Sequence, residues 1–218
     1  MNSPLLLVLG AGPGLGLSVA RRFGREGYAV ALAGQTAEQM QPLADTLIGE
    51  GITASALGVE LADPSAVYDF VSSVGEEAGH IDVLHFNPSA WREKDPLELS
   101  VAELFEDLSL GVAPLLPAIQ AARPFMSEGG RVLVTGSAAA DKPWHKAASL
   151  GVQKAAVRNL VTSLDATLEP DGIRAVAVQV NGVLDKEGPF APPAVADALY
   201  AATVRPNDGW TPHVSYDG

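Results

Sequence analysis

The sequence predicts an α/β protein built on a doubly wound, mostly parallel sheet of about seven strands flanked by helices. Short apolar runs alternate with longer segments of helical periodicity along the 218 residues. A glycine-rich stretch, GAGPGLG at residues 10–16, directly follows the first apolar run and opens the first helical segment. Such alternation implies right-handed crossovers, with helices on both faces of the sheet. Since no repeat or long linker interrupts the pattern, we expect one domain over residues 1–218.

Each predicted strand is a short apolar run. Residues 5–9 are apolar throughout, as in a parallel strand that is buried on both faces. The last run, residues 213–216, follows Pro212, and a proline there suits a strand at the edge of the sheet. The predicted strands cover residues 5–9, 28–33, 52–59, 81–86, 131–135, 173–180 and 213–216.

Several predicted helices carry recognisable signals at their ends. Asp63 is a suitable N-cap, with Pro64 at the first helical position. Pro114 and Pro117 should kink or break the long segment 101–126, because proline lacks the N–H that a helix interior needs. The predicted helices cover residues 14–26, 37–50, 64–78, 101–126, 146–168 and 193–203.

Composition and charge exclude several classes of protein. With 47% hydrophobic and 18% charged residues, the chain should fold into a packed globule. The net charge of −12 argues against nucleic acid and anionic membranes as partners. The chain has no cysteine, which excludes disulfides and thiolate metal sites and fits a cytoplasmic protein. The opening MNSPLLLVLGAG lacks basic residues before its apolar run, so we expect a buried first strand there and not a signal peptide.

The glycine-rich stretch has the sequence and position of a dinucleotide-binding loop in a Rossmann fold. Gly10 permits a tight turn, while Gly14 and Gly16 allow close approach of a pyrophosphate and of the helix to the sheet. Gly12 and Leu15 complete the expected cofactor-binding set, and the helix N-terminus favours the anion. The alternative is a tight strand-to-helix turn that binds no ligand.

The end of the second strand favours NADP(H) over NAD(H). NAD sites usually offer an acidic residue there to the ribose diol, whereas this chain reads ALAGQT. Gly34 is expected to leave room for a 2′-phosphate, and Gln35 and Thr36 can donate hydrogen bonds to it. The sequence places no arginine to pair with that phosphate.

On these motifs, the chain resembles the short-chain dehydrogenase/reductase (SDR) family over nearly its whole length. Its loop is similar to the family's T-G-x-x-x-G-x-G, with Leu9 in place of the threonine. Glu60 follows the third strand, where the family has an acidic residue near the adenine. HFNPSA, after the fourth strand, is similar to the family's N-N-A-G and keeps one asparagine, Asn87. The resemblance implies NAD(P)(H) binding at these positions and oxidoreduction of a small carbonyl or alcohol.

The resemblance also implies where catalysis takes place. GRVLVTGS is similar to the family's fifth strand with its catalytic serine, here Ser137, and the family's Y-x-x-x-K falls on Leu150 and Lys154. The family's tyrosine gives a proton to the carbonyl oxygen, and its lysine lowers the pKa of that tyrosine. Leu108 stands where the family has an asparagine that holds a relay water. Leucine neither donates nor accepts a proton, so two polar catalytic groups are missing.

The residues left for catalysis also have structural interpretations. Lys154 could bind the nicotinamide ribose or be a solvated helix lysine, and Ser137 could serve the substrate or cap a strand end. His145 is the first candidate for a replacement proton donor, because histidine titrates near neutral pH, although an ordinary loop histidine fits this position too. Trp91 could wall the pocket or be an exposed loop aromatic.

Two functions stay open at this point. The first is an NADP(H)-dependent oxidoreductase with an altered proton donor. The second is a non-redox member of the fold, either a cofactor-binding regulator or an enzyme of another reaction, such as cyclisation or elimination. We expect a small-molecule ligand and no metal, with His80 and His85 either packed or in solvent. By the resemblance, we also expect a homodimer or homotetramer in which the helices 101–126 and 146–168 pair across a two-fold axis.

Overall fold

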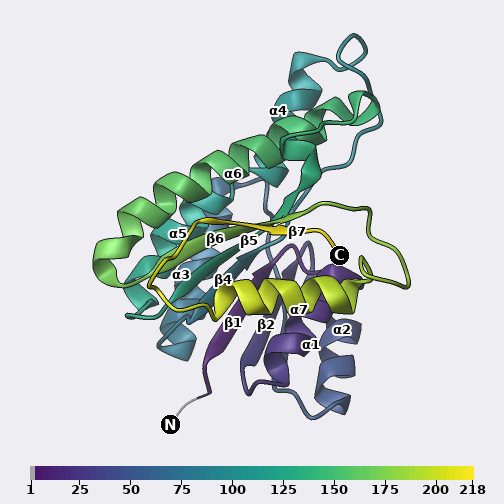
Figure 1. The fold of residues 1–218 in the computed structure, drawn as a ribbon. Coiled ribbons are helices and arrows are strands. Elements are labelled where there is room, and N and C mark those ends of the chain that lie inside the picture. Colours follow the sequence, from purple (N-terminus) through teal and green to yellow (C-terminus); the bar gives the residue numbers. More distant parts are fainter. Residues whose placement is uncertain (1–2) are drawn as a thin grey trace.

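A parallel sheet of seven strands forms the centre of the protein (Figure 1). The computed structural model describes residues 3–218. The strands follow the order β3-β2-β1-β4-β5-β6-β7, and each neighbouring pair is parallel. This confirms the predicted fold class, and β7 lies at the edge. The strands are β1 (Leu5–Leu9), β2 (Ala29–Gly34), β3 (Ala54–Gly58), β4 (Val83–Phe86), β5 (Arg131–Ser137), β6 (Arg174–Val180) and β7 (His213–Tyr216).

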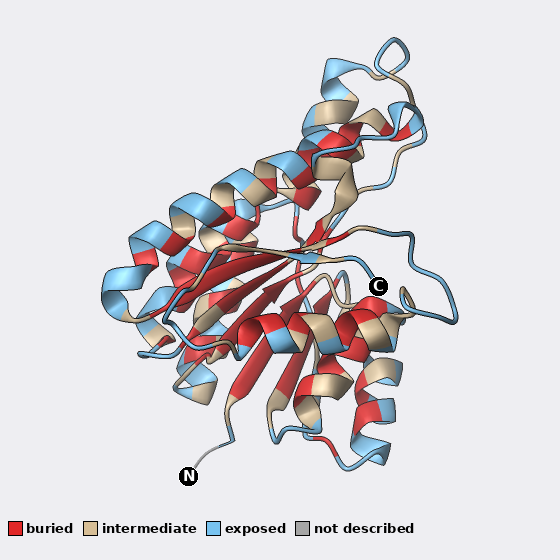
Figure 2. Ribbon diagram, viewed as in Figure 1, coloured by how far each residue is buried: buried red, intermediate tan, exposed pale blue. Residues whose placement is uncertain are grey.

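Helices cover both faces of the sheet, so that the strands lie buried between two layers (Figure 2). One core forms between the sheet and α3, α5 and α6, and the other forms under α1, α2 and α7. All five residues of β1 are buried, as its unbroken apolar run predicts. The helices are α1 (Leu15–Gly24), α2 (Ala37–Gly49), α3 (Pro64–Ala78), α4 (Val101–Gly111), α5 (Leu115–Ala122), α6 (Ala148–Leu168) and α7 (Pro192–Thr203).

Proline breaks the long helical segment predicted for residues 101–126. The helix α4 ends at Gly111, and α5 begins at Leu115 with Pro114 as its N-cap. Pro117 lies in the first turn of α5, where its missing N–H costs no helical hydrogen bond. The predicted break is confirmed at Pro114. A short 3-10 helix, η1 (Arg123–Phe125), completes the segment.

Asp63 caps α3 as predicted. Its Oδ1 accepts hydrogen bonds from the backbone N–H groups of Ser65 at 2.9 Å and Ala66 at 3.3 Å, and Pro64 occupies the first helical position. The helix α6 begins two residues later than the prediction, at Ala148, because a short 3-10 helix, η3 (His145–Ala147), precedes it.

The loops that follow β1, β4, β5 and β6 meet at the carboxyl edge of the sheet. The chain passes from β1 to β2 on one side, while β4 pairs with β1 on the other, so the strand order reverses beside β1. In sheets of this kind, ligands bind outside the carboxyl edge at such a reversal. Among the helices described here, none is long and apolar enough to cross a membrane.

Candidate cofactor and active site

The loop between β1 and α1 leaves an open cradle at the helix N-terminus. A Cβ atom added to Gly12 or Gly14 would meet no other heavy atom within 4 Å, so both positions face free space. Gly14 is the N-cap of α1, and no side chain caps this helix. The N–H of Leu17 donates to the carbonyl oxygen of Gly12 at 2.9 Å, and the N–H groups of Leu15 and Gly16 before it remain for an anion. This geometry fits the pyrophosphate of a dinucleotide.

Two other glycines shape the loop through close packing. Gly10 has a φ of +73°, and a Cβ atom on it would lie 2.9 Å from Pro88. A Cβ atom on Gly16 would lie 3.0 Å from Cα of Ala11. Nδ2 of Asn87 donates a hydrogen bond to the carbonyl oxygen of Gly10 at 3.0 Å. The loop is therefore tied to the end of β4, and larger side chains at Gly10 and Gly16 would distort it.

A cleft of about 570 Å³ at the carboxyl edge brings this loop together with Ser137 and Lys154, two of the three predicted catalytic residues. Ser137 ends β5, and Leu150 and Lys154 come from successive turns of α6. Leu150 lines the cleft beside Lys154, at the position where the resemblance expects a tyrosine. The predicted site residues on the cleft wall are Gly12, Gly14, Leu15, Gly16, Asn87, Ser137 and Lys154.

Lys154 is buried, so the interpretation as a solvated helix lysine is wrong. Only 6% of the residue is exposed, and its Nζ donates a hydrogen bond to the carbonyl oxygen of Thr135 at 3.1 Å. Burial lowers the pKa of Lys154 from 10.5 to about 8. The side chain therefore carries a proton at neutral pH and releases it more readily than a surface lysine does.

A fully buried histidine on β4 supports the floor of the cleft. Nε2 of His85 lies 2.9 Å from Oγ1 of Thr135, and this hydroxyl donates to Oδ1 of Asn87 at 2.8 Å. Because the threonine proton is used in that bond, Nε2 of His85 must carry its own proton. Burial, followed by the charge of Lys154, lowers the pKa of His85 to about 3, so the ring is neutral. The hydrogen-bond chain from His85 through Thr135 and Asn87 orients the glycine loop.

Sequence reasoning expected His85 either to pack or to lie in solvent and gave it no role. A histidine within the otherwise apolar run VLHF was the available signal, since a polar side chain in a buried strand needs a partner. Its Nδ1 has no hydrogen-bond partner among the described residues.

Ser137 caps the end of β5, one of the two roles that the sequence left open, and it also lines the cleft. Its Oγ accepts a hydrogen bond from the backbone N–H of Ala139 at 3.2 Å, at the start of the 3-10 helix η2 (Ala138–Ala140). A hydroxyl that accepts still has its own proton to donate. Since Ser137 also lines the cleft, that proton is available to a ligand there.

A second hollow, of about 550 Å³, contains the residues predicted for the adenosine end of the cofactor. Gln35 follows β2 and Glu60 follows β3, and both are exposed on its wall. Arg92, from the loop after β4, lines the same hollow. Sequence reasoning missed Arg92 because only the folded sheet brings this loop beside β2 and β3. Its guanidinium donates to both carboxylate oxygens of Asp107 and to Oε1 of Glu103.

The space beside Gly34 is closed, which corrects the expectation that it leaves room for a 2′-phosphate. A Cβ atom on Gly34 would lie 2.6 Å from Sδ of Met40, so this side chain of α2 already fills the position. Thr36 is the N-cap of α2, and its Oγ1 accepts from the backbone N–H of Gln39 at 3.2 Å. The Thr36 hydroxyl still has its own proton to donate, and Gln35 beside it is exposed, so both remain polar groups at this strand end.

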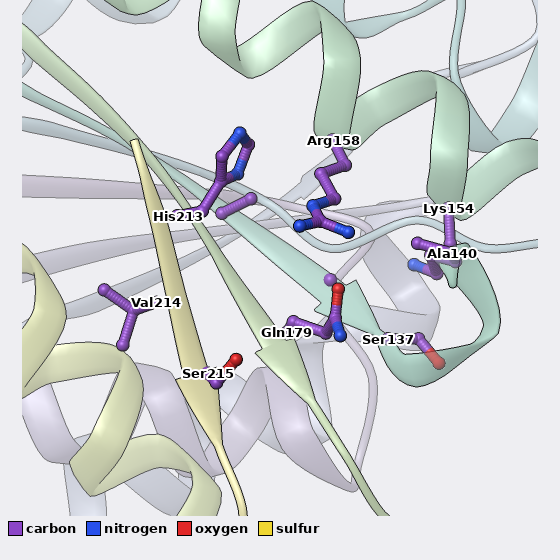
Figure 3. Close-up of a pocket in the computed structure, with 10 residues that line it drawn as sticks. Ser137, Ala140, Lys154, Arg158, Gln179, His213, Val214 and Ser215 are labelled. Carbon is purple, nitrogen blue, oxygen red and sulfur yellow. The ribbon is translucent and has the colours of Figure 1, made fainter. Parts of the chain in front are cut away.

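Lys154 also borders a small cavity of about 60 Å³ that polar and apolar side chains line together (Figure 3). Lys154 and Arg158 reach this cavity from α6, while Gln179 of β6 and His213 of β7 line it from the sheet. Oε1 of Gln179 and Nδ1 of His213 lack hydrogen-bond partners among the described residues. A cavity of this size has room for an ordered water when polar atoms without partners face it. The cavity therefore offers water a place close to the buried lysine.

His145 and Leu108 lie outside the cleft. His145 is exposed, its ring centroid is 6.5 Å from that of Trp144, and both residues line a separate apolar hollow of about 630 Å³ between α4 and α6. Leu108 lies on α4 next to the buried Asp107. The structure thus brings Ser137 and Lys154 together and leaves His145 apart from them.

The parallel sheet, the glycine loop and the cleft at the strand-order reversal define a nucleotide-binding Rossmann fold. Comparison with known families agrees with this class, because the family model described as short chain dehydrogenase matches residues 4–186. The chain therefore belongs to the short-chain dehydrogenase/reductase family, whose members are NAD(P)-binding oxidoreductases.

Individual relatives resemble the chain over part or all of its length. It is 34% identical over 129 residues to the (2S)-[(R)-hydroxy(phenyl)methyl]succinyl-CoA dehydrogenase subunit BbsC of Thauera aromatica, a match covering 59% of this chain and 51% of that protein. It is 30% identical over 178 residues to the oxidoreductase UcpA of Escherichia coli (strain K12), covering 79% and 66% respectively. The solved structure of a short chain dehydrogenase from Burkholderia cenocepacia J2315 in complex with NADP superimposes with a TM-score of 0.86 at 26% identity, over 99% of this chain and 96% of that chain. The matches with the two curated relatives thus span about half and about two thirds of their lengths.

Proposed function

We propose that the protein is an NADP(H)-dependent oxidoreductase of a small carbonyl or alcohol substrate, and that the whole chain forms one cofactor-binding domain. The observation that carries this proposal is the shared cleft, since Ser137 and Lys154 line the same space as the open glycines Gly12 and Gly14. A cofactor on the loop would thus lie next to groups that can serve a substrate oxygen. The Escherichia coli relative is named an oxidoreductase, and the Thauera relative a dehydrogenase of a hydroxy compound.

The residues present fit a dinucleotide along the carboxyl edge of the sheet. The open cradle suits its pyrophosphate, Asn87 and Lys154 suit the nicotinamide half, and Gln35 and Glu60 line the hollow for the adenosine half. When bound, the cofactor supplies or accepts a hydride. The neutral Gln35 at the end of β2, where NAD sites usually have an acid, supports NADP(H). The NADP in the Burkholderia structure supports the same choice.

Lys154 is the residue best placed to supply the proton that the absent tyrosine would give. Among the described residues that line the cleft, it has the titratable side chain. With its pKa lowered to about 8 by burial, the ammonium group is protonated at pH 7 and is a stronger acid than a surface lysine. As the carbonyl carbon is reduced, the Nζ–H bond breaks and the proton passes to the substrate oxygen. Ser137 donates a hydrogen bond to that oxygen, and the neutral amine then regains a proton from water.

We also propose that the chain forms a homodimer or homotetramer through α4, α5 and α6. Val101, Phe105, Leu116 and Val152 on these helices are between 43% and 68% exposed. Large apolar side chains gathered on one group of helices favour association. Light scattering at micromolar concentration should report a dimer or larger species, and Phe105→Lys should reduce its size. A monomeric parent protein would contradict this assembly.

Turnover of NADPH with a panel of activated diketones tests the proposed reaction. We expect slow, stoichiometric conversion of diketone to hydroxyketone. Loss of a positioned general acid such as the family's tyrosine typically costs about 10²–10⁴ in rate, and Lys154 recovers only part of this loss. Lys154→Met should abolish this conversion, and His145→Ala should leave it intact. If His145→Ala abolished it instead, the loop histidine would be the donor. NADPH binding with no turnover in the parent protein would favour the non-redox alternatives.

A further inference from the structure

Two tryptophans form a stacked pair at the rim of the cleft. The ring centroids of Trp91 and Trp144 are 6.1 Å apart, and their planes are inclined by 26°. Trp91 is 63% exposed and Trp144 is 46% exposed. Tryptophan is largely buried in most folded proteins, so two neighbouring indoles with this much free surface are well suited to bind an apolar ligand.

Trp91 belongs to the same cleft as the catalytic residues, and Trp144 continues the rim beyond it. Trp91 lines the cleft together with Ser137 and Lys154. Trp144 lines the adjacent apolar hollow between α4 and α6. The stacked pair therefore joins the rims of the two hollows.

The loop that carries Trp91 is fixed to α6. Gln153 is fully buried, and its side-chain amide accepts from the N–H of Ala90 at 2.9 Å and donates to the carbonyl oxygen of Ala90 at 3.1 Å. Gln153 directly precedes Lys154, and Ala90 directly precedes Trp91. The two hydrogen bonds therefore hold the backbone that carries Trp91 at a set place relative to α6, and the indole stacks on Trp144. An aromatic surface restrained in this way binds a ring with less loss of conformational entropy than a free side chain does.

The wall next to Trp91 is apolar as well. Leu150, Val183 and Leu184 line the cleft, and Val183 is 88% exposed. The polar groups that can meet a substrate oxygen, Ser137 and Lys154, lie on the same cleft. A ligand that fits this arrangement has an uncharged, flat, apolar body and a single polar end.

We propose that the Trp91–Trp144 pair binds the aromatic ring system of the substrate, so that the substrate class is aryl ketones, aryl aldehydes and the corresponding alcohols. The assignment of the carbonyl rests on the proposed function, whereas binding of the ring does not require turnover. The leucine at position 150 contributes to this class, because it replaces a phenol with an apolar surface facing the ring.

Ligand-observed NMR titration with 2-acetonaphthone and with its saturated counterpart 2-acetyldecalin tests the proposal. The two ketones have the same carbon skeleton but differ in flatness and aromaticity. We expect the parent protein to bind the naphthyl ketone at least 5-fold more tightly than the saturated one. Trp91→Leu should weaken binding of the naphthyl ketone about 5-fold and leave the affinity for the saturated ketone unchanged. A 5-fold change corresponds to the loss of one aromatic contact worth about 1 kcal/mol. Trp91→Phe should restore most of the affinity.

Tyr68→Leu is the matched control, because Tyr68 is also an exposed aromatic residue, at 44%, but lies on α3 away from the cleft. It should change neither affinity. Equal binding of the two ketones, or equal effects of Trp91→Leu and Tyr68→Leu, would overturn the proposal. A parent oligomer that dissociates in Trp91→Leu would also overturn it, by showing that the pair is an interface between copies. NADPH fluorescence, recorded on the same samples, reports separately whether the cofactor site is intact.

Discussion

The side chain of Gln153 and the backbone of Ala90 exchange two hydrogen bonds, at 2.9 and 3.1 Å, across the interface between α6 and the loop after β4. Gly111 on α4 makes room for this contact, because a Cβ atom there would lie 2.0 Å from Oε1 of Gln153. One residue of α6 thus holds the loop, and the next residue, Lys154, faces the cleft. These two hydrogen bonds link the rim of the cleft to the helix that carries Lys154.

Gln153→Leu should therefore lower the free energy of unfolding by about 1–3 kcal/mol. The leucine has a similar volume but would leave the N–H and the carbonyl of Ala90 without their present partners. Urea denaturation followed by circular dichroism measures the change. Gln120→Leu, at an exposed position on α5, is the matched control and should stay within about 0.5 kcal/mol of the parent protein. Equal stability of the two variants would show that the hydrogen bonds between Gln153 and Ala90 contribute nothing to the free energy of unfolding.

Gly14→Val should abolish NADPH binding without unfolding the protein. A Cβ atom at this position meets no protein atom within 4 Å, so the branched side chain would project into the space for the pyrophosphate. Enhancement of NADPH fluorescence should appear with the parent protein and disappear in the variant, while thermal unfolding of both stays similar. Gly49→Ala, on α2, also adds a side chain in open space and should keep full binding. Absence of binding by the parent protein at millimolar NADPH would refute the dinucleotide site.

Burial of Lys154 should make stability depend on pH in a defined direction. Because its pKa falls from 10.5 to about 8 on folding, the unfolded chain holds more protons than the folded chain between these values. The contribution of this group to the free energy of unfolding therefore rises with pH in that window. Below about pH 8 the folded chain carries the buried ammonium, and the full free-energy cost of burying it applies. Relative to Lys154→Met, the free energy of unfolding of the parent protein should increase by about 2 kcal/mol between pH 7 and pH 10.

Chemical denaturation of both proteins across this pH range measures the difference. Lys186→Met removes an exposed lysine and serves as the matched control. Its free energy of unfolding should depend on pH in the same way as that of the parent protein. A parallel curve for Lys154→Met as well would mean that the lysine is charged to the same extent in the folded and unfolded chains.

The sheet and its helices followed from local signals that act on neighbouring residues. The apolar run of β1, the cap at Asp63 and the break at Pro114 each depend on hydrogen bonding or burial within a few residues, so a sequence displays them directly. Lys154 and Ser137 were expected to meet because the parallel strands and α6 bring their ends to one edge.

The remaining features depend on which distant side chain fills a given space, and a sequence does not display this. The side chain of Met40 fills the space beside Gly34. A glycine at the end of a strand leaves such a space whether a side chain or a phosphate occupies it, so the local sequence does not distinguish the two. The partner of His85 lies on β5, fifty residues along the chain. Likewise, Arg92 approaches Gln35 only after β4 and β2 take their places on either side of β1.

The central claim is that this cleft keeps the geometry of a reductase although leucine stands in the position of the family's tyrosine, and Leu150→Tyr tests it most directly. The substitution would place a phenol one helical turn before Lys154, on the same face of α6 and in the cleft that Ser137 lines. The measurement is kcat/KM for NADPH-dependent reduction of an activated diketone by the variant and by the parent protein. We predict a gain of about 10²-fold, the low end for a general acid, because the resemblance places Leu108 where the family has the asparagine of its proton relay. No gain in a folded variant that binds NADPH would contradict the account, since the cleft would then not present a carbonyl to the cofactor.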